Sequence, residues 1–164
     1  MKKLYTMLLL VISLCTASCS DWLDVSPSNQ VNGDKLFEIG DGYRNALNGI
    51  YLNLGTSSMY GQTMSWGFMD AIAQYYKTDN GSNFIPKTSA YYKSAKFQFE
   101  DSDVKTFISN IWSVSYNNIA NCNNLILNVS EASPSVFKEG EFEKNMIWGE
   151  ALALRAFMHF DLLR

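Results

Sequence analysis

Apolar residues recur at helical spacing along most of the chain after residue 40, and this periodicity constrains the fold more than any other feature. Side chains three or four positions apart lie on one face of an α-helix, whereas a half-buried strand requires strict alternation. The pattern predicts an all-α fold. Four helices are expected, over residues 43–54, 59–76 and about 101–129, and from beyond Gly140 to the end of the sequence.

Polar and small residues mark the ends of these predicted helices. Asp41 is expected to cap the first helix and Gly55 to end it, and Asp101 or Asp103 can cap the third. The predicted inward face of the first helix is Tyr43, Ala46, Leu47, Ile50, Tyr51 and Leu54. That of the third is Val104, Phe107, Ile108, Ile111, Ser115, Ile119, Cys122 and Ile126. That of the fourth is Phe142, Met146, Gly149, Ala153, Ala156, Phe157, Phe160 and Leu163.

Residues 77–101 break the helical pattern with turn-forming residues and aromatic rings, and they are expected to form a long loop. A loop of this length in a compact domain is often functional. Aromatic rings can cover the apolar face of a sugar, while amides and carboxylates bind its hydroxyl groups. The candidate ligand-binding residues, chosen by this chemistry, are Trp66, Asp70, Tyr75, Asp79, Asn80, Tyr91 and Tyr92. The alternative is that the rings pack the loop onto the helices.

The N-terminus has the pattern of a secretory signal peptide that ends at a lipidatable cysteine. Lys2 and Lys3 precede an apolar run, and small residues stand directly before Cys19. The run is too short to cross a bilayer, which takes about 20 residues. Because Thr16 occupies a position where such signals usually carry leucine, an ordinary signal with an unmodified thiol is the alternative. The predicted organisation is a signal peptide over residues 1–18, a lipidated tether over 19–33 and a helical domain over 34–164.

Removal of the signal peptide changes the charge and the number of cysteines. The mature chain would keep 11 basic residues against 16 acidic ones, a balance that argues against nucleic acid as a partner. Cys15 would leave with the signal and Cys19 would be acylated, so Cys122 would remain without a disulfide partner. Cys122 lies on a predicted buried face and has no histidine near it in the sequence. A core role is therefore expected, rather than that of a nucleophile.

Motifs typical of enzymes are missing from the sequence. It contains no Gly-x-Ser-x-Gly elbow, phosphate-binding loop, His-Glu-x-x-His helix or Cys-x-x-Cys pair. His159, the sole histidine, is expected to be structural. Glu150 and Arg155 are expected to form a structural polar pair, or capping contacts with a neighbouring helix, rather than to act as acid and base. The sequence predicts a protein without catalytic residues, metal or cofactor. A surface glycosidase remains an alternative, because two acidic side chains of the chain can meet in space.

Residues 148–164, WGEALALRAFMHFDLLR, closely resemble the EA-x-x-LRA-x-x-x-(F/Y)-D-L helix of SusD-like (RagB/SusD) lipoproteins. Residues 19–24, 43–51 and 111–123 agree with the same family in the same order. The resemblance implies a tetratricopeptide-like helical solenoid that is lipid-anchored to the outer membrane and faces the cell exterior. It also implies a non-enzymatic protein that captures glycans, or sometimes peptides, for a SusC-like TonB-dependent transporter.

The sequence stops while the fourth predicted helix is still in phase, with no residue that would end it. Members of the SusD-like family continue beyond the matching helix. We therefore expect an N-terminal portion that is incomplete at its C-terminus, whether as a fragment, a truncated gene product or half of a split gene. A structural helical fragment that needs a second chain is the alternative function.

Overall fold

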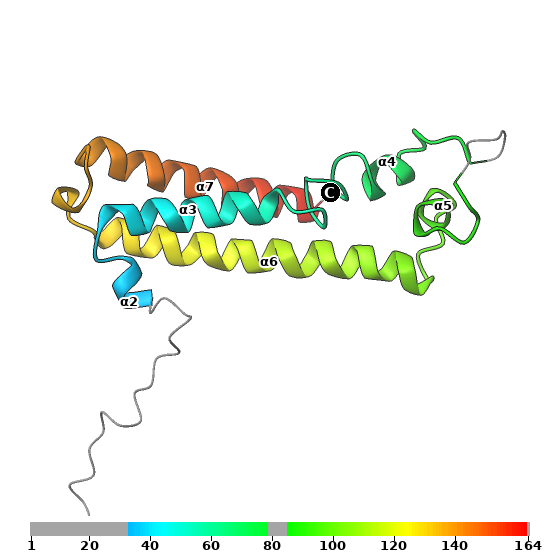
Figure 1. The fold of residues 1–164 in the computed structure, drawn as a ribbon, viewed down its shortest axis with the longest axis horizontal. Helices are drawn as coiled ribbons and strands as arrows, with labels where there is room; N and C mark the ends of the chain where they lie inside the picture. Colours follow the sequence, from blue (N-terminus) through cyan, green and yellow to red (C-terminus); the bar gives the residue numbers. More distant parts are fainter. Residues whose placement is uncertain (1–32, 79–84, 164) are drawn as a thin grey trace, which may run out of the picture. The chain divides into compact units, whose positions relative to one another are not determined.

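A computed structural model describes residues 33–78 and 85–163 of the chain (Figure 1). Contacts divide the chain at Lys35, and nearly all described residues belong to the unit Leu36–Arg164. The described ranges contain helices and turns but no strand, which confirms the predicted all-α fold. No helix within these ranges is both long and apolar enough to cross a membrane. The elements are α2 (Gly33–Leu36), α3 (Gly40–Leu54), α4 (Phe68–Ile72), α5 (Ala90–Ala95), α6 (Ser102–Glu131), the 3₁₀ turn η2 (Pro134–Val136) and α7 (Glu141–Leu163).

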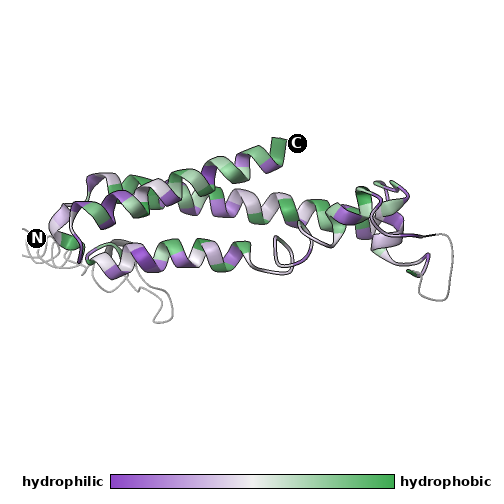
Figure 2. Cartoon of the chain, turned by 90° about the horizontal axis from the view of Figure 1, so that it is seen from above, coloured by the Kyte–Doolittle hydropathy of each residue, from purple (hydrophilic) through white to green (hydrophobic). Residues whose placement is uncertain are grey.

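Helix α6 is the central element, with α7 and α3 packed along it (Figure 1, Figure 2). Its 30 residues span about 45 Å at 1.5 Å per residue. Helices α3 and α7 also contact each other, so one apolar core lies among the three helices. That core includes Tyr43, Leu47, Ile50 and Leu54 from α3, Ile119, Cys122, Leu125 and Val129 from α6, and Ile147, Ala151 and Met158 from α7.

The ends of α6 and α3 are capped differently. The side chain of Asp101 caps α6 as predicted, because it accepts a hydrogen bond from the backbone N–H two residues later at 2.9 Å. The predicted cap of α3 is wrong. Its N-cap is Ile39, and Asp41 lies in the first turn, where it accepts a hydrogen bond from Lys138 Nζ at 2.7 Å. Gly55 ends α3 as predicted.

The helix predicted over residues 59–76 is wrong except for the short α4. Turns replace its first half because the chain folds back over the end of α3. The backbone N–H of Tyr60 donates to the carbonyl of Leu54, and that of Gly61 to the carbonyl of Thr56, both at 3.0 Å. A Cβ at Gly61 would lie only 2.7 Å from the Thr56 oxygen. The close backbone approach that sets this turn therefore depends on glycine.

A short helix interrupts the long loop predicted over residues 77–101. Helix α5 occupies part of its second half. The Lys93 ammonium group lies 3.0 Å from the carboxylate of Asp101 and 2.7 Å from that of Asp103. These ion pairs connect α5 to the first turn of α6.

The predicted inward face of α6 is largely confirmed. Val104, Ser115, Ile119 and Cys122 are buried, whereas Ile108 is exposed. Burial raises the pKa of the Cys122 thiol to about 11, although the nearby Arg155 opposes this effect. The thiol is therefore protonated at neutral pH and inaccessible, which confirms its expected core role.

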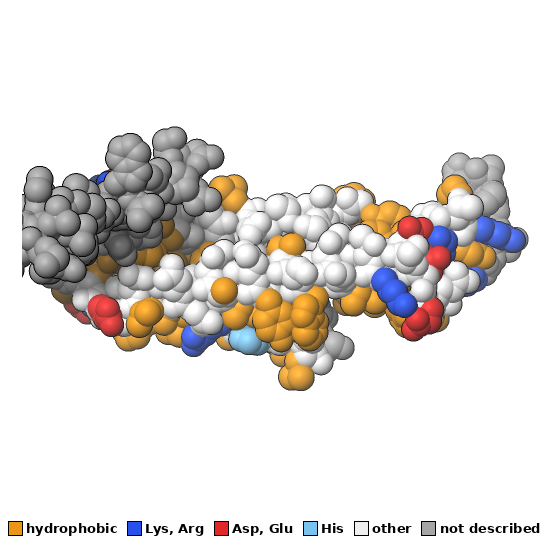
Figure 3. Space-filling model, turned by 90° about the horizontal axis from the view of Figure 1, so that it is seen from below, with side chains coloured by type: hydrophobic (Ala, Val, Ile, Leu, Met, Phe, Trp, Pro, Cys, Tyr) orange, Lys and Arg blue, Asp and Glu red, His pale blue; other side chains and the backbone are white. Residues whose placement is uncertain are grey.

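The face of α7 predicted to point inward is wrong, because none of its residues is buried. Phe160 is 62% exposed and Leu163 is 86% exposed. Figure 3 shows hydrophobic side chains gathered around the single histidine, which belongs to α7. Apolar residues occur on several faces of this helix, so periodicity cannot select the buried one. The buried residues of α7 are Glu143, Ile147, Ala151 and Met158.

Glu143 is a buried acid whose partners explain why this face of α7 turns inward. Its carboxylate accepts hydrogen bonds from the backbone N–H of Glu139 at 3.1 Å and from Arg44 Nη2 at 2.6 Å. These two bonds, the backbone one first, lower the pKa of Glu143, whereas burial opposes them. The ion pair with Arg44 joins α3 to α7.

Glu143 should make the fold sensitive to acid. Because its pKa is lowered in the folded chain, its contribution is complete above the ordinary glutamate pKa of about 4.3 and is lost as the pH falls through the lower, folded value. We expect Glu143→Gln to lower the thermal midpoint at pH 7 and to make that midpoint fall less steeply as the pH drops below about 4.3. Circular dichroism melts across this pH range test the prediction. Glu141→Gln, at an exposed position on the same turn, is the control. A Glu143→Gln protein with the acid sensitivity of the unaltered chain would contradict the account.

Candidate functional site

Trp66 projects from the turn-rich segment between α3 and α4. Its side chain is 57% exposed, while its backbone carbonyl accepts a hydrogen bond from the Tyr76 hydroxyl. Gly67, which follows it, is the N-cap of α4 and donates its N–H to the carbonyl of Gln62 at 2.8 Å. The backbone around Trp66 is therefore held in place while the indole ring remains open to solvent.

Tyr91 lies on α5 and is held at both ends of its side chain. Its ring stacks on that of Phe107 from α6, with the centroids 5.2 Å apart, and its hydroxyl accepts a hydrogen bond from Gln62 Nε2 at 2.7 Å. Phe68 of α4 contacts the same Phe107 ring at 5.7 Å. These contacts join α4, α5 and α6 and orient Tyr91 without the help of a ligand.

Four side chains, Trp66, Tyr76, Ile85 and Tyr91, line a cavity of about 160 Å³. The cavity is smaller than the roughly 300–1,000 Å³ pockets that hold drug-sized ligands, and it suits one ring-sized group. Its walls are mainly aromatic. The tyrosine hydroxyl groups each make one hydrogen bond within the protein and retain capacity for another. The surface that the lining residues present to the cavity is apolar, so it suits the apolar face of a ligand ring.

Of the residues predicted to bind ligand, Trp66 and Tyr91 come together in this cavity. Asp70 and Tyr92 do not line it. Asp70 lies half-buried on α4, and Tyr92 lies half-buried on α5 with Lys96 Nζ 5.7 Å from its ring centre. The structure therefore separates the predicted residues that line the cavity from those that do not.

Tyr75 is 79% exposed and stands next to the lining residue Tyr76 without lining the cavity itself. Sequence analysis missed Tyr76 and Ile85. Tyr76 directly follows Tyr75, which was chosen for its aromatic ring, so the same reasoning could have selected Tyr76. The side chain of Ile85 has no chemistry that indicates carbohydrate binding. Three predicted residues lie outside the described ranges: Asp79, Asn80 and Cys19.

The polar residues of α7 make contacts between helices. The Tyr51 hydroxyl donates to Glu150 Oε2 at 2.9 Å, and burial, followed by this carboxylate, raises the pKa of Tyr51. Arg155 Nη1 donates to Asn123 Oδ1 of α6 at 2.9 Å. Of the two roles predicted for Glu150 and Arg155, contact with a neighbouring helix is the one that the structure shows, and His159 is exposed. Among the described residues, no cluster of histidine, cysteine and acidic side chains could hold a metal ion.

Comparison with protein families gives one match that covers nearly all of the chain after the predicted signal peptide. A model of the SusD-like group, described as "Starch-binding associating with outer membrane", matches residues 21–164. The comparisons with curated proteins and with solved structures give no match.

Proposed function

The chain belongs to the SusD-like family, described as starch-binding and associated with the outer membrane, and from this premise we propose that it captures glycan nutrients for a SusC-like TonB-dependent transporter. The cavity lined by Trp66 and Tyr91 is the observation that supports glycan capture. Proteins of this family bind their ligands and are generally not enzymes. The proposed role is therefore capture and delivery without cleavage.

The exposed indole of Trp66 would cover the apolar face of one sugar ring, and Tyr91 would form another wall of the cavity. Tyr91 is oriented in the absence of ligand through Gln62 and Phe107, and the backbone that carries Trp66 is held by Tyr76. Preorganised side chains lose little conformational freedom on binding, so more of the contact energy contributes to affinity. Tyr75, which is exposed and precedes the lining residue Tyr76, would offer a further aromatic surface to a neighbouring sugar.

The proposal places the protein on the outer surface of the outer membrane, attached through acyl chains on Cys19. The sequence pattern of residues 1–19 supports this anchor. Each buried methylene contributes about 0.8 kcal/mol, so two or more acyl chains hold a protein at the membrane where one chain would be reversible. A permanent anchor would keep the captured glycan close to the transporter.

A second candidate function is structural packing against another polypeptide. It is favoured by the exposed apolar face of α7, where Phe142, Phe157, Phe160 and Leu163 are exposed. Contiguous apolar surface of this kind is typical of protein–protein contacts. In this role the chain would contribute no glycan affinity of its own.

Co-sedimentation with insoluble starch tests the proposed function. The detergent-solubilised full chain should bind saturably, and the supernatant should gain no reducing ends. Absence of binding, together with stable association with a second polypeptide, would contradict glycan capture and favour the structural role. Formation of reducing ends would instead favour the glycosidase alternative.

A further inference from the structure

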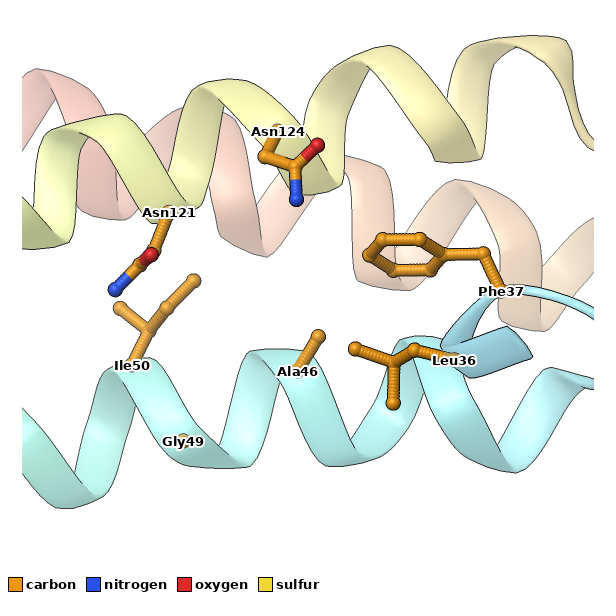
Figure 4. Close-up of a pocket in the computed structure, with 7 residues that line it drawn as sticks. All are labelled: Leu36, Phe37, Ala46, Gly49, Ile50, Asn121 and Asn124. Carbon is orange, nitrogen blue, oxygen red and sulfur yellow. The ribbon is translucent and has the colours of Figure 1, made fainter. Parts of the chain in front are cut away.

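A groove of about 280 Å³ lies between α3 and α6 (Figure 4). Ala46, Gly49 and Ile50 of α3 form one side, and Asn121 and Asn124 of α6 form the other. Leu36, the last residue of α2, and Phe37, which follows it, close one end. This groove shares no lining residue with the aromatic cavity.

The α3 side of the groove is apolar and open. Ile50 is nearly fully buried, so the accessible part of this side comes from half-buried Ala46 and exposed Gly49. No heavy atom lies within 4 Å of the position that a Cβ at Gly49 would occupy. The missing side chain therefore leaves accessible space between the two helices.

The α6 side of the groove carries amide groups with unused hydrogen-bonding capacity. Asn124 Oδ1 accepts from Asn128 Nδ2 at 3.0 Å, and the Asn124 amide nitrogen points toward α3 (Figure 4). Asn121 Nδ2 donates to Asn117 Oδ1 at 3.2 Å, which leaves the Asn121 oxygen as an acceptor. Asparagine is a poor helix former, so helical propensity does not account for these asparagines of α6.

We propose that this groove is a second carbohydrate site, which takes one hexose unit of an α-glucan. This inference rests on the proposed function of the protein. The apolar α3 side would contact one face of the sugar ring, and the Asn121 and Asn124 amides would bind its hydroxyl groups. The lining contains no charged side chain, which suits a neutral ligand. The volume lies just below the range for drug-sized ligands, as one sugar unit requires.

The two proposed sites lie along the same helix. Tyr91 of the aromatic cavity stacks on Phe107, and Asn121 stands 14 positions later on α6. At 1.5 Å per residue, these positions are about 21 Å apart along the helix axis. One sugar unit cannot occupy both sites, whereas one polysaccharide chain can. Simultaneous engagement would raise affinity for long glycans above that for short ones.

The test is an NMR titration of the full chain, solubilised in detergent, with maltotriose. The side-chain amide signals of Asn121 and Asn124 should shift and saturate. Gly49→Leu fills the groove where space is open, and it should weaken this response by at least tenfold. The control, Asn48→Leu, places the same side chain at an exposed neighbouring position that does not line the groove. It should leave the response unchanged.

The indole N–H signal of Trp66 reports on the aromatic cavity in the same titration, so the two proposals can fail separately. If the indole signal shifts and saturates while the asparagine signals do not, the groove inference is overturned and glycan capture stands. The groove inference is also overturned if Gly49→Leu leaves the asparagine response unchanged. If the asparagine signals shift and the indole signal does not, the groove stands and the cavity assignment fails. If neither responds, both proposals are overturned.

Discussion

Replacing Gly42 by alanine should lower the free energy of unfolding by about 3 to 5 kcal/mol, as expected for a severe clash in a packed core. Gly42 is buried near the start of α3, and its N–H donates to the carbonyl of Ile39 at 2.9 Å. A Cβ at this position would overlap the backbone carbonyl of Leu36. Because the obstacle is backbone, relief requires the segment before α3 to move. Phe37 would move with it and lose its ring contact with Tyr43, now at 4.9 Å.

Urea unfolding followed by circular dichroism measures this effect, and Gly49→Ala is the matched control on the same helix. Nothing lies within 4 Å of a Cβ at Gly49, so alanine there should raise stability by about 0.5 to 1 kcal/mol through helix propensity. The two substitutions add the same methyl group and should have opposite signs. If the free energy of unfolding of the Gly42→Ala protein lies within about 1 kcal/mol of that of the unaltered chain, the packing described for the segment before α3 is contradicted.

Periodicity predicted the fold where the apolar residues of a helix form one stripe. In α6 the predicted residues Ser115, Ile119 and Cys122 are buried, and Asp101 caps the helix as expected. In α3 the predicted residues Leu47 and Ile50 are buried as well. In both helices local sequence and tertiary packing favour the same face, so no long-range information was needed.

Periodicity failed in α7, where apolar residues occur on more than one face. The buried face contains Glu143, which the apolar pattern does not mark, and an unpaired buried carboxylate is costly. Its partner Arg44 is 99 positions away, and this contact becomes visible only in the folded chain. The exposed residues Phe157 and Phe160 therefore looked like core residues.

The chemistry of the candidate site was visible in the sequence, but its geometry was not. Trp66 and Tyr91 were chosen because aromatic rings suit carbohydrate, and they line one cavity. Their approach depends on a backbone turn that requires Gly61 and on the stacking of Tyr91 against Phe107. Neither contact leaves a local signature. Ile85 lines the same cavity and carries no chemical signal of binding.

Replacing Trp66 by alanine should weaken starch binding by at least tenfold and leave the stability of the fold nearly unchanged. The side chain is more than half exposed, so its removal takes little area from the core. The hydrogen bond from Tyr76 persists because it ends on the backbone carbonyl of Trp66. The cavity loses one wall and the sugar loses a stacking surface. A tenfold loss corresponds to about 1.4 kcal/mol, which a single aromatic anchor in a binding site commonly supplies.

The most direct measurement of the central claim is the affinity for soluble starch of three proteins, the unaltered chain, Trp66→Ala and Trp148→Ala, by affinity electrophoresis. Trp148 is exposed on α7 and does not line the cavity, so it controls for the loss of a surface indole. The account predicts strong retardation of the unaltered chain and of Trp148→Ala, with at least tenfold weaker affinity for Trp66→Ala. Equal retardation of all three proteins, or no retardation of the unaltered chain, would contradict glycan capture at this cavity.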